Sequence, residues 1–126
     1  GWNEVSKNVF EFADDLAGSG PFSVIMPDFY RGEPWSVTEF PPQSDLQQNA
    51  FETWLKGVAA DIVVRKDIYE KVLPHLQKAN HSKIGVYGVC WGGKQAFLLG
   101  ADADRFNGVA SIHGAWIDEK LADSLQ

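Results

Sequence analysis

The order of elements along the 126 residues predicts a three-layer α/β/α fold with a mostly parallel sheet. Helical and strand patterns alternate along the chain, and this alternation favours parallel strands with helices on both faces of the sheet. The expected strands are short apolar runs, which is typical of strands buried between two helical layers. Because we find no internal repeat, linker or low-complexity segment, we expect a single domain over residues 1–126.

The first part of the chain predicts a helix, a strand and a long loop. Asn3 can cap a helix whose apolar residues recur at helical spacing until Gly18 ends it. Residues 22–26 (FSVIM) form an apolar run that Pro27 ends, so we expect a short buried strand there. The stretch that follows, PDFYRGEPWSVTEFPPQSD, has no periodicity and predicts a loop, and its four aromatic residues argue against disorder.

Two helices are expected next. The first runs over about residues 45–57, and the second begins near Asp61 with an apolar stripe. Pro74 lies inside this second pattern and should kink the last turns or restart them as a separate turn, because proline lacks the N–H that the helix uses.

The last part of the chain predicts two more strands and two more helices. We expect strands over residues 84–89, which should be buried, and 108–112, a helix over about residues 92–100 and a final helix from Ile117 onward. In parallel sheets, ligands bind beyond the carboxyl ends of the strands. Three segments should meet at this rim, residues 28–35, 88–93 and 113–116.

Composition argues against several classes of function. The net charge is −6, and eleven basic residues are scattered among seventeen acidic ones, so we expect no nucleic-acid partner. No apolar run approaches the roughly 20 residues of a membrane span, so we expect no membrane partner. The three histidines lie far apart and lack metal-ligand spacing, so we expect no metal. A single cysteine fits a reducing, cytoplasmic compartment. The chain opens at Gly1 without an initiator methionine, so we expect the natural protein to begin earlier.

The single cysteine lies where a strand pattern gives way to a helix pattern, in GVYGVCWGGKQAF. A nucleophile at such a turn needs small neighbours because the chain folds back sharply. The motif G-x-C-x-G-G supplies Gly88, Gly92 and Gly93. The turn would place Cys90 at a helix N-terminus, where partial positive charge favours a thiolate, and would aim the Trp91 N–H at a developing oxyanion. The pattern therefore predicts ester hydrolysis through a covalent thiol-acyl intermediate.

Other interpretations of this turn remain open. Cys90 can be a small buried residue, with glycines that only let the helix pack against the sheet. A phosphate-binding loop is disfavoured, because neither the P-loop nor the dinucleotide pattern is present. Two further alternatives are a redox-sensing thiol and a non-catalytic binding module that presents its tryptophan-rich rim to a ligand. Exposed strand edges would also allow self-association.

Three stretches resemble the dienelactone hydrolases, which are α/β-hydrolases with a cysteine in place of the serine nucleophile. These stretches are GWNEVSKNVFEFADDLA, VIMPDFYRG and KIGVYGVCWGGKQAF, and the resemblance spans nearly the whole chain. It implies that the chain is an incomplete α/β-hydrolase-like core, which corresponds to the central part of a longer enzyme. It also implies that this enzyme hydrolyses small esters or lactones without a cofactor. The triad Asp and His are then expected beyond residue 126, so the fragment alone should be inactive.

The resemblance also implies roles for individual residues. Cys90 would be the nucleophile and the Trp91 N–H an oxyanion donor, and the loop over residues 28–32 would line the pocket. Arg31 would hold a substrate carboxylate, although its alternative is a solvated surface cation. His113 ends the last predicted strand at the rim, so we expect it to contact the substrate or the thiol. The pocket aromatics, with the hydrophobic core as their alternative, are Phe29, Tyr30, Trp35, Trp91 and Trp116.

Overall fold

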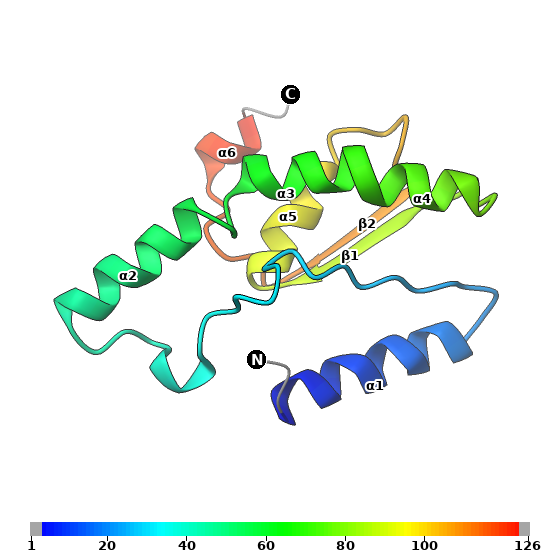
Figure 1. Cartoon of the computed structure of the whole chain (residues 1–126). Coiled ribbons are helices and arrows are strands. Elements are labelled where there is room, and N and C mark those ends of the chain that lie inside the picture. Colours follow the sequence, from blue (N-terminus) through cyan, green and yellow to red (C-terminus); the bar gives the residue numbers. More distant parts are fainter. Residues whose placement is uncertain (1–3, 124–126) are drawn as a thin grey trace. The chain divides into compact units, whose positions relative to one another are not determined.

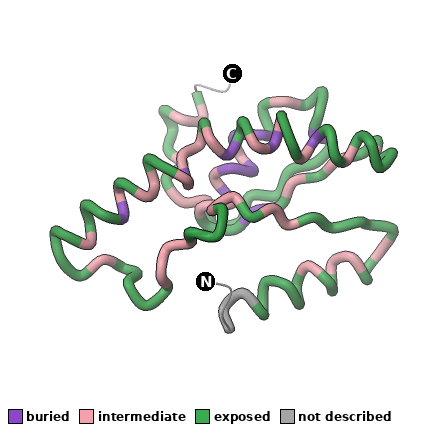
Figure 2. Tube along the Cα trace, in the orientation of Figure 1, coloured by how far each residue is buried: buried purple, intermediate pink, exposed green. Residues whose placement is uncertain are grey.

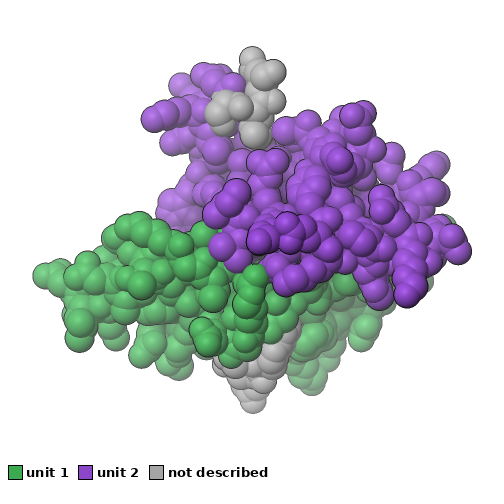
Figure 3. All heavy atoms as spheres, turned by 45° about the horizontal axis from the view of Figure 1, so that its top comes forward, with its two compact units in different colours: residues 1–60 green, residues 61–126 purple. Residues whose placement is uncertain are grey.

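The computed structural model describes residues 4–123 and divides the chain into two compact units, residues 1–60 and 61–126 (Figure 3). Figure 1 gives the order of the elements. Asn3, the predicted cap of the first helix, lies outside the described residues. The single domain over residues 1–126 stays a prediction.

Unit 1 contains helix α1 (Glu4–Gly18), a short 3₁₀ turn η1 (Val37–Glu39) and helix α2 (Asp45–Lys56). Both predicted helices are therefore confirmed. Ser44 caps α2, because its side chain accepts a hydrogen bond of 3.3 Å from the N–H of Gln47. Such a cap satisfies one of the N–H groups that the first helical turn leaves without an intrahelical acceptor.

We predicted that residues 22–26 form a strand and that this strand is buried, and both predictions are wrong. The segment runs as an extended trace without strand pairing (Figure 1), and Phe22 and Ile25 are 59% and 44% exposed. A strand exists only where a neighbouring strand takes up its backbone N–H and C=O groups. Among residues 4–123, only the two strands of unit 2 pair with each other. The apolar run therefore has no pairing partner in the described part of the chain.

The long loop of unit 1 is ordered by its aromatic side chains. Tyr30 packs on Trp54 with ring centroids 5.0 Å apart, and Trp35 packs edge-on against Phe51 at 5.1 Å. The indole Nε1–H of Trp54 also donates a hydrogen bond of 2.8 Å to the carbonyl oxygen of Glu33. These contacts tie the loop to α2 and bury Phe51, which is 8% exposed. An ordered loop, as the aromatic content predicted, is confirmed.

Unit 2 begins with a continuous helical segment that consists of three parts (Figure 1). These are α3 (Asp61–Asp67), a π-helical turn η2 (Ile68–Val72) and α4 (Leu73–Lys78). Pro74 has no N–H to donate, and in an α-helix its ring would clash with the carbonyl four residues earlier. The π turn widens the helix just before Pro74, so the helix continues where we expected a kink or a restart.

The sheet of unit 2 has two parallel strands, β1 (Gly85–Val89) and β2 (Gly108–Ile112), paired in register from Gly85 opposite Gly108. Helix α5 (Trp91–Leu99) connects them and contacts both strands, and a short helix α6 (Glu119–Asp123) follows. The predicted parallel arrangement is therefore confirmed for two of the three expected strands.

The core of unit 2 lies between helices, as Figure 2 shows by its buried stretches. The buried apolar residues of this core are Val64, Ile68, Leu73, Ala96, Leu98, Leu99 and Phe106. The strands are more exposed than predicted: every residue of β2 is exposed, and in β1 only Gly88 is buried. The reason is that the described sheet has two strands, whereas strands become buried when neighbours cover their edges and both faces.

Candidate active site

Cys90 lies at the junction of β1 and α5 and is the N-cap residue of the helix. Its backbone has φ 56° and ψ −115°, a region that residues with a side chain avoid because of steric strain. The thiol is exposed to solvent. This exposure argues against the alternative interpretation of Cys90 as a buried core residue.

Both peptide groups of Cys90 are held by the strand and turn that follow α5 in the sequence. The Cys90 N–H donates to the carbonyl of Ile112 (3.0 Å), and the Ala115 N–H donates to the carbonyl of Cys90 (2.9 Å). Our reading of the sequence missed these two partners. The only sequence signal for them was their position, because Ile112 is the last residue of β2 and Ala115 lies in the turn that follows it.

Two of the three glycines around Cys90 are required by close packing. A Cβ at Gly88 would overlap the carbonyl of Gly92, and a Cβ at Gly93 would lie 2.9 Å from the Cα of Gly114. Both contacts are with backbone, which cannot move aside as a side chain can. A Cβ at Gly92 would meet no atom within 4 Å in the described part of the chain. The steric need for glycine is therefore at Gly88 and Gly93.

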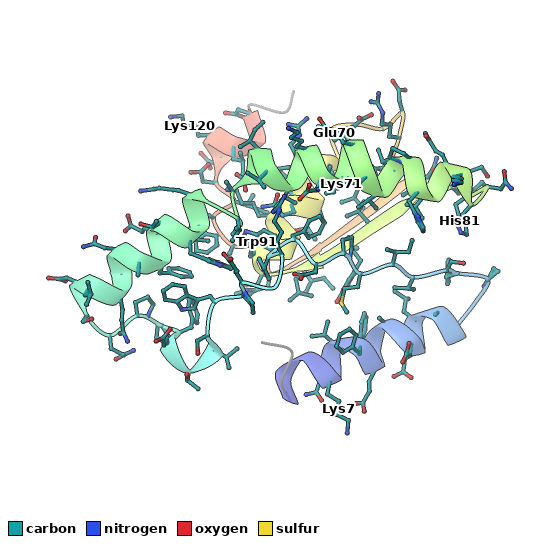
Figure 4. The ribbon with its side chains drawn as sticks, in the orientation of Figure 1. Lys7, Glu70, Lys71, His81, Trp91 and Lys120 are labelled. Atoms are coloured by element: carbon teal, nitrogen blue, oxygen red, sulfur yellow. The ribbon has the colours of Figure 1, made fainter. Side chains whose placement is uncertain are left out.

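Trp91 opens α5 next to Cys90, and Figure 4 shows it at the end of β1 opposite to the end near His81. His81 follows α4, which contains His75. His113 comes directly after β2 with φ 49° and is exposed, in the same turn as Ala115. The structure thus brings the turn of His113 against Cys90, and contact of His113 with a substrate stays a prediction.

Trp116, in the turn after β2, has φ 58° and is 55% exposed, and its place in a pocket stays a prediction. The remaining predicted site residues belong to unit 1. Asp28 orders their loop, because its carboxylate accepts hydrogen bonds from the N–H groups of Tyr30 (3.1 Å) and Gly32 (2.8 Å). Arg31 has φ 54°, and its guanidinium donates to the carbonyl of Phe29 at 3.0 Å. Tyr30 and Trp35 are half-buried in the aromatic cluster with α2. Substrate binding by Tyr30, Arg31 and Trp35 stays a prediction.

A charged cluster ties the helical segment of unit 2 to the residues after α5. The Tyr69 hydroxyl and the Arg105 guanidinium both donate to Oδ2 of Asp102 at 2.7 Å. The hydrogen bond from Tyr69, followed by that from Arg105, lowers the pKa of Asp102 below its ordinary value. Burial, followed by the hydrogen bond to Asp102, raises the pKa of Tyr69. The cluster therefore stabilises the region beyond the C-terminal end of α5.

A cavity of about 380 Å³ opens on unit 2, between the C-terminal end of α5 and β2. Its lining residues are Phe97, Gly100, Ala101, Val109 and Ser111, and none of them is a predicted site residue. Within residues 4–123 there is no group of three His, Cys, Asp or Glu side chains that could hold a metal ion. None of the helices in that range has both the length and the apolar character needed to cross a bilayer.

Two parallel strands joined by a helix, with an exposed cysteine at the strand-to-helix turn, are consistent with an incomplete α/β-hydrolase fold. The sequence model of the dienelactone hydrolase family matches residues 1–126, and the chain belongs to this family. No solved structure matches the chain.

Curated relatives are similar over most of the chain. An uncharacterized AIM2 family protein of Schizosaccharomyces pombe is 33% identical over 124 residues, which cover 96% of this chain and 48% of the relative. The carboxymethylenebutenolidase homolog of Homo sapiens is 33% identical over 116 residues, which cover 90% of this chain and 42% of that protein. The carboxymethylenebutenolidase homolog of Rattus norvegicus is 38% identical over 95 residues. The chain therefore spans less than half the length of these relatives.

Proposed function

We propose that the chain supplies the nucleophile of a hydrolase that cleaves small esters or lactones through a thioester on Cys90. The observation that carries this proposal is the geometry of Cys90, an exposed thiol with φ 56° at the junction of β1 and α5. A residue with a side chain keeps such a strained backbone only where the surrounding structure holds it, and strain of this kind clusters at active sites. Membership of the dienelactone hydrolase family supports the same reaction class.

The proposed first step forms the acyl-enzyme. The Cys90 thiolate attacks the substrate carbonyl, so that a C–S bond forms and the carbonyl electron pair moves to oxygen. The Trp91 N–H stabilises this oxyanion. When the intermediate collapses, the C–O bond to the leaving group breaks and the alkoxide takes up a proton from a general acid. Water then attacks the thioester, the general base accepts its proton, and the C–S bond breaks to release the carboxylic acid product and restore the Cys90 thiolate.

We place the general acid and base, a histidine oriented by an aspartate, in sequence beyond residue 126. This placement is supported by the curated relatives, which are about twice as long as the chain. In the same proposal Arg31 holds a substrate carboxylate, Tyr30, Trp35 and His113 contact the substrate, and the enzyme works in the cytoplasm. Residues 1–126 alone would then acylate at Cys90 but would not turn over.

The experiment compares residues 1–126 with the complete protein that contains them, using p-nitrophenyl acetate as the ester. We expect the chain alone to release one equivalent of p-nitrophenol and to gain one acetyl group at Cys90, measured by mass spectrometry. The complete protein should turn over continuously, and Cys90→Ala should abolish both effects. Sustained turnover that survives Cys90→Ala would refute the proposal.

A second candidate function, a redox-sensing thiol, is favoured by the exposure of Cys90. It predicts reversible oxidation by peroxide and no acylation by esters. A thiol that reacts with neither peroxide nor ester would favour a non-catalytic binding module. The acylation experiment and a parallel peroxide titration therefore distinguish the hydrolase, the redox-sensing thiol and the binding module.

A further inference from the structure

Asp61, the first residue of α3, is bonded to two consecutive residues of α5. The Lys94 ammonium donates to its Oδ2 at 2.6 Å, and the Gln95 amide Nε2 donates to its Oδ1 at 2.7 Å. Each carboxylate oxygen therefore accepts one bond, and α3 and α5 are in contact. These residues lie 33 and 34 positions apart in the sequence, so the bonds join two separate helices.

The two groups of α5 are buried or mostly buried, whereas the Asp61 side chain that they bind is 39% exposed. Gln95 is 5% exposed, and the side chain of Lys94 is 19% exposed. A buried amide and a mostly buried ammonium cost free energy unless they are hydrogen-bonded. The Gln95 Oε1 has no hydrogen-bond partner among the described residues, so the bond to Asp61 is the one that this amide is positioned to make.

Lys94 is also one helical turn from Cys90. Its N–H donates to the carbonyl of Cys90 at 3.2 Å, which is the first α-helical hydrogen bond of α5. The turn between them contains Gly92 and Gly93, and glycine is about 1 kcal/mol less favourable than alanine in a helix. The start of α5 therefore has low intrinsic stability, and the side chains of Lys94 and Gln95 tie it to α3.

We infer that Asp61 is a positioning residue for Cys90, an inference that deepens the proposed function and rests on it for its kinetic consequence. By binding Lys94 and Gln95, the carboxylate fixes the first turn of α5, and with it the direction of the Trp91 N–H. Without the carboxylate, this turn would fray and the thiol and the oxyanion donor would lose their relative orientation. The acylation step would slow, whereas substrate binding, which uses other residues, would change little.

The test uses the complete protein that contains the chain and the variants Asp61→Asn and Lys94→Met. We expect kcat for p-nitrophenyl acetate to fall about tenfold or more, with KM within about twofold, because orientation affects the transition state more than ground-state binding. The backbone amides of residues 94 and 95, the first in α5 with an acceptor in the turn before them, should exchange hydrogen faster. The double variant should be little slower than either single variant, since both changes break the same bond.

The matched control is Lys71→Met, which also removes a lysine from an ion pair with an aspartate. Lys71 Nζ lies 2.7 Å from Oδ1 of Asp67, within the same helical segment, and its side chain is 68% exposed (Figure 4). This variant should keep wild-type kcat and wild-type exchange at residues 94 and 95. An equal loss in Lys71→Met would contradict a specific role of Asp61.

A conservative variant keeps the inference testable if Asp61→Asn does not fold. Lys94→Arg retains a cation that can donate to Asp61, so it should restore most of the kcat that Lys94→Met loses. Wild-type kcat and wild-type exchange in Lys94→Met would overturn the inference. If wild-type protein hydrolyses no ester, the proposed function fails, and hydrogen exchange at residues 94 and 95 still decides whether Asp61 holds the turn.

Discussion

At the residue scale, the most informative feature is the backbone of Cys90. The φ of this residue is positive, and both of its peptide groups are hydrogen-bonded, the N–H as donor to the Ile112 carbonyl and the carbonyl as acceptor from the Ala115 N–H. Backbone strain of this kind costs about 1–3 kcal/mol. The exposed position of the sulfur is therefore maintained at the expense of local stability, which is typical of functional residues.

This strain can be measured by comparing two variants that both lack the thiol. Cys90→Gly should be more stable than Cys90→Ala by about 1 kcal/mol, because glycine adopts this conformation without steric cost while its greater freedom in the unfolded chain offsets part of the gain. Urea unfolding gives both free energies. Equal stability, or a more stable alanine variant, would show that the backbone of Cys90 is not strained.

The glycines before and after Cys90 predict opposite outcomes for the same substitution. Gly88→Ala should destabilise the protein by about 2 kcal/mol or more, because its Cβ would overlap the backbone of Gly92. Gly92→Ala should be neutral or stabilise by up to about 1 kcal/mol, because its Cβ has open space and alanine favours the helix. Thermal unfolding of the two variants tests this contrast. Similar losses in both would contradict the packing described for this turn.

At the scale of elements, α5 is held at both ends. Asp61 holds its start, and the cluster of Tyr69, Asp102 and Arg105 ties the segment after its C-terminal end to η2. The π turn contributes to this cluster, because it contains Tyr69. The sequence predicted these helices, but their cross-connections depend on pairs that are more than thirty residues apart.

The cluster predicts a pH dependence of stability. The pKa of Asp102 is lowered in the folded state, so its contribution is present above the ordinary pKa of an aspartate and is lost as the pH falls through the lowered value. We therefore expect the free energy of unfolding to fall less on acidification in Asp102→Asn than in wild type. Urea unfolding at a series of pH values from about 6 to about 3 measures this difference.

Tyr69→Phe serves as the second variant, because it removes the hydroxyl that donates to Asp102 and keeps the ring. It should weaken the same acid dependence without abolishing it, since Arg105 still donates to Asp102. Identical pH profiles in wild type and Asp102→Asn would contradict the role of the cluster.

At the scale of the whole molecule, the described chain leaves apolar segments exposed. Residues 22–26 have the composition of a buried strand, but they pair with no strand among the described residues, and all of them except the half-buried Met26 are exposed. The paired strand β2 is also exposed along its length. Backbone amides that lack hydrogen bonds exchange readily with solvent, whereas amides in paired strands and helices are protected.

Hydrogen exchange of the chain tests this difference directly. We expect slow exchange in α5 and at the paired positions of β1 and β2, and fast exchange at Val24, Ile25 and Met26. The comparison with the complete protein is informative, because new protection at these three amides would indicate a strand partner outside residues 1–126. Slow exchange of residues 22–26 in the chain alone would contradict the unpaired conformation.

Much of the fold could be predicted from local signals. Glycine and proline positions, helical spacing and apolar runs located α1, α2, α5 and both strands, because these signals act within a few residues. The strand at residues 22–26 was predicted wrongly because pairing requires a neighbour, which no local pattern contains. In the candidate site, Cys90 was visible from its glycine neighbours, whereas Ile112, Ala115 and Asp61 were not, since contacts across the sheet and between helices have no local signature.

The sequence by itself determined the α/β fold class, the order of the helices and paired strands, and the family. It also determined that the single thiol lies at a strand-to-helix junction. Tertiary structure alone decided the strained backbone of Cys90, its hydrogen bonds with Ile112 of β2 and with Ala115 of the following turn, and the hydrogen bonds that Asp61 accepts from α5. The physical reason is the sequence distance over which each effect acts. Propensity and steric needs are properties of neighbouring residues, whereas a hydrogen bond between distant residues exists only once the chain has folded and brought its donor and acceptor together.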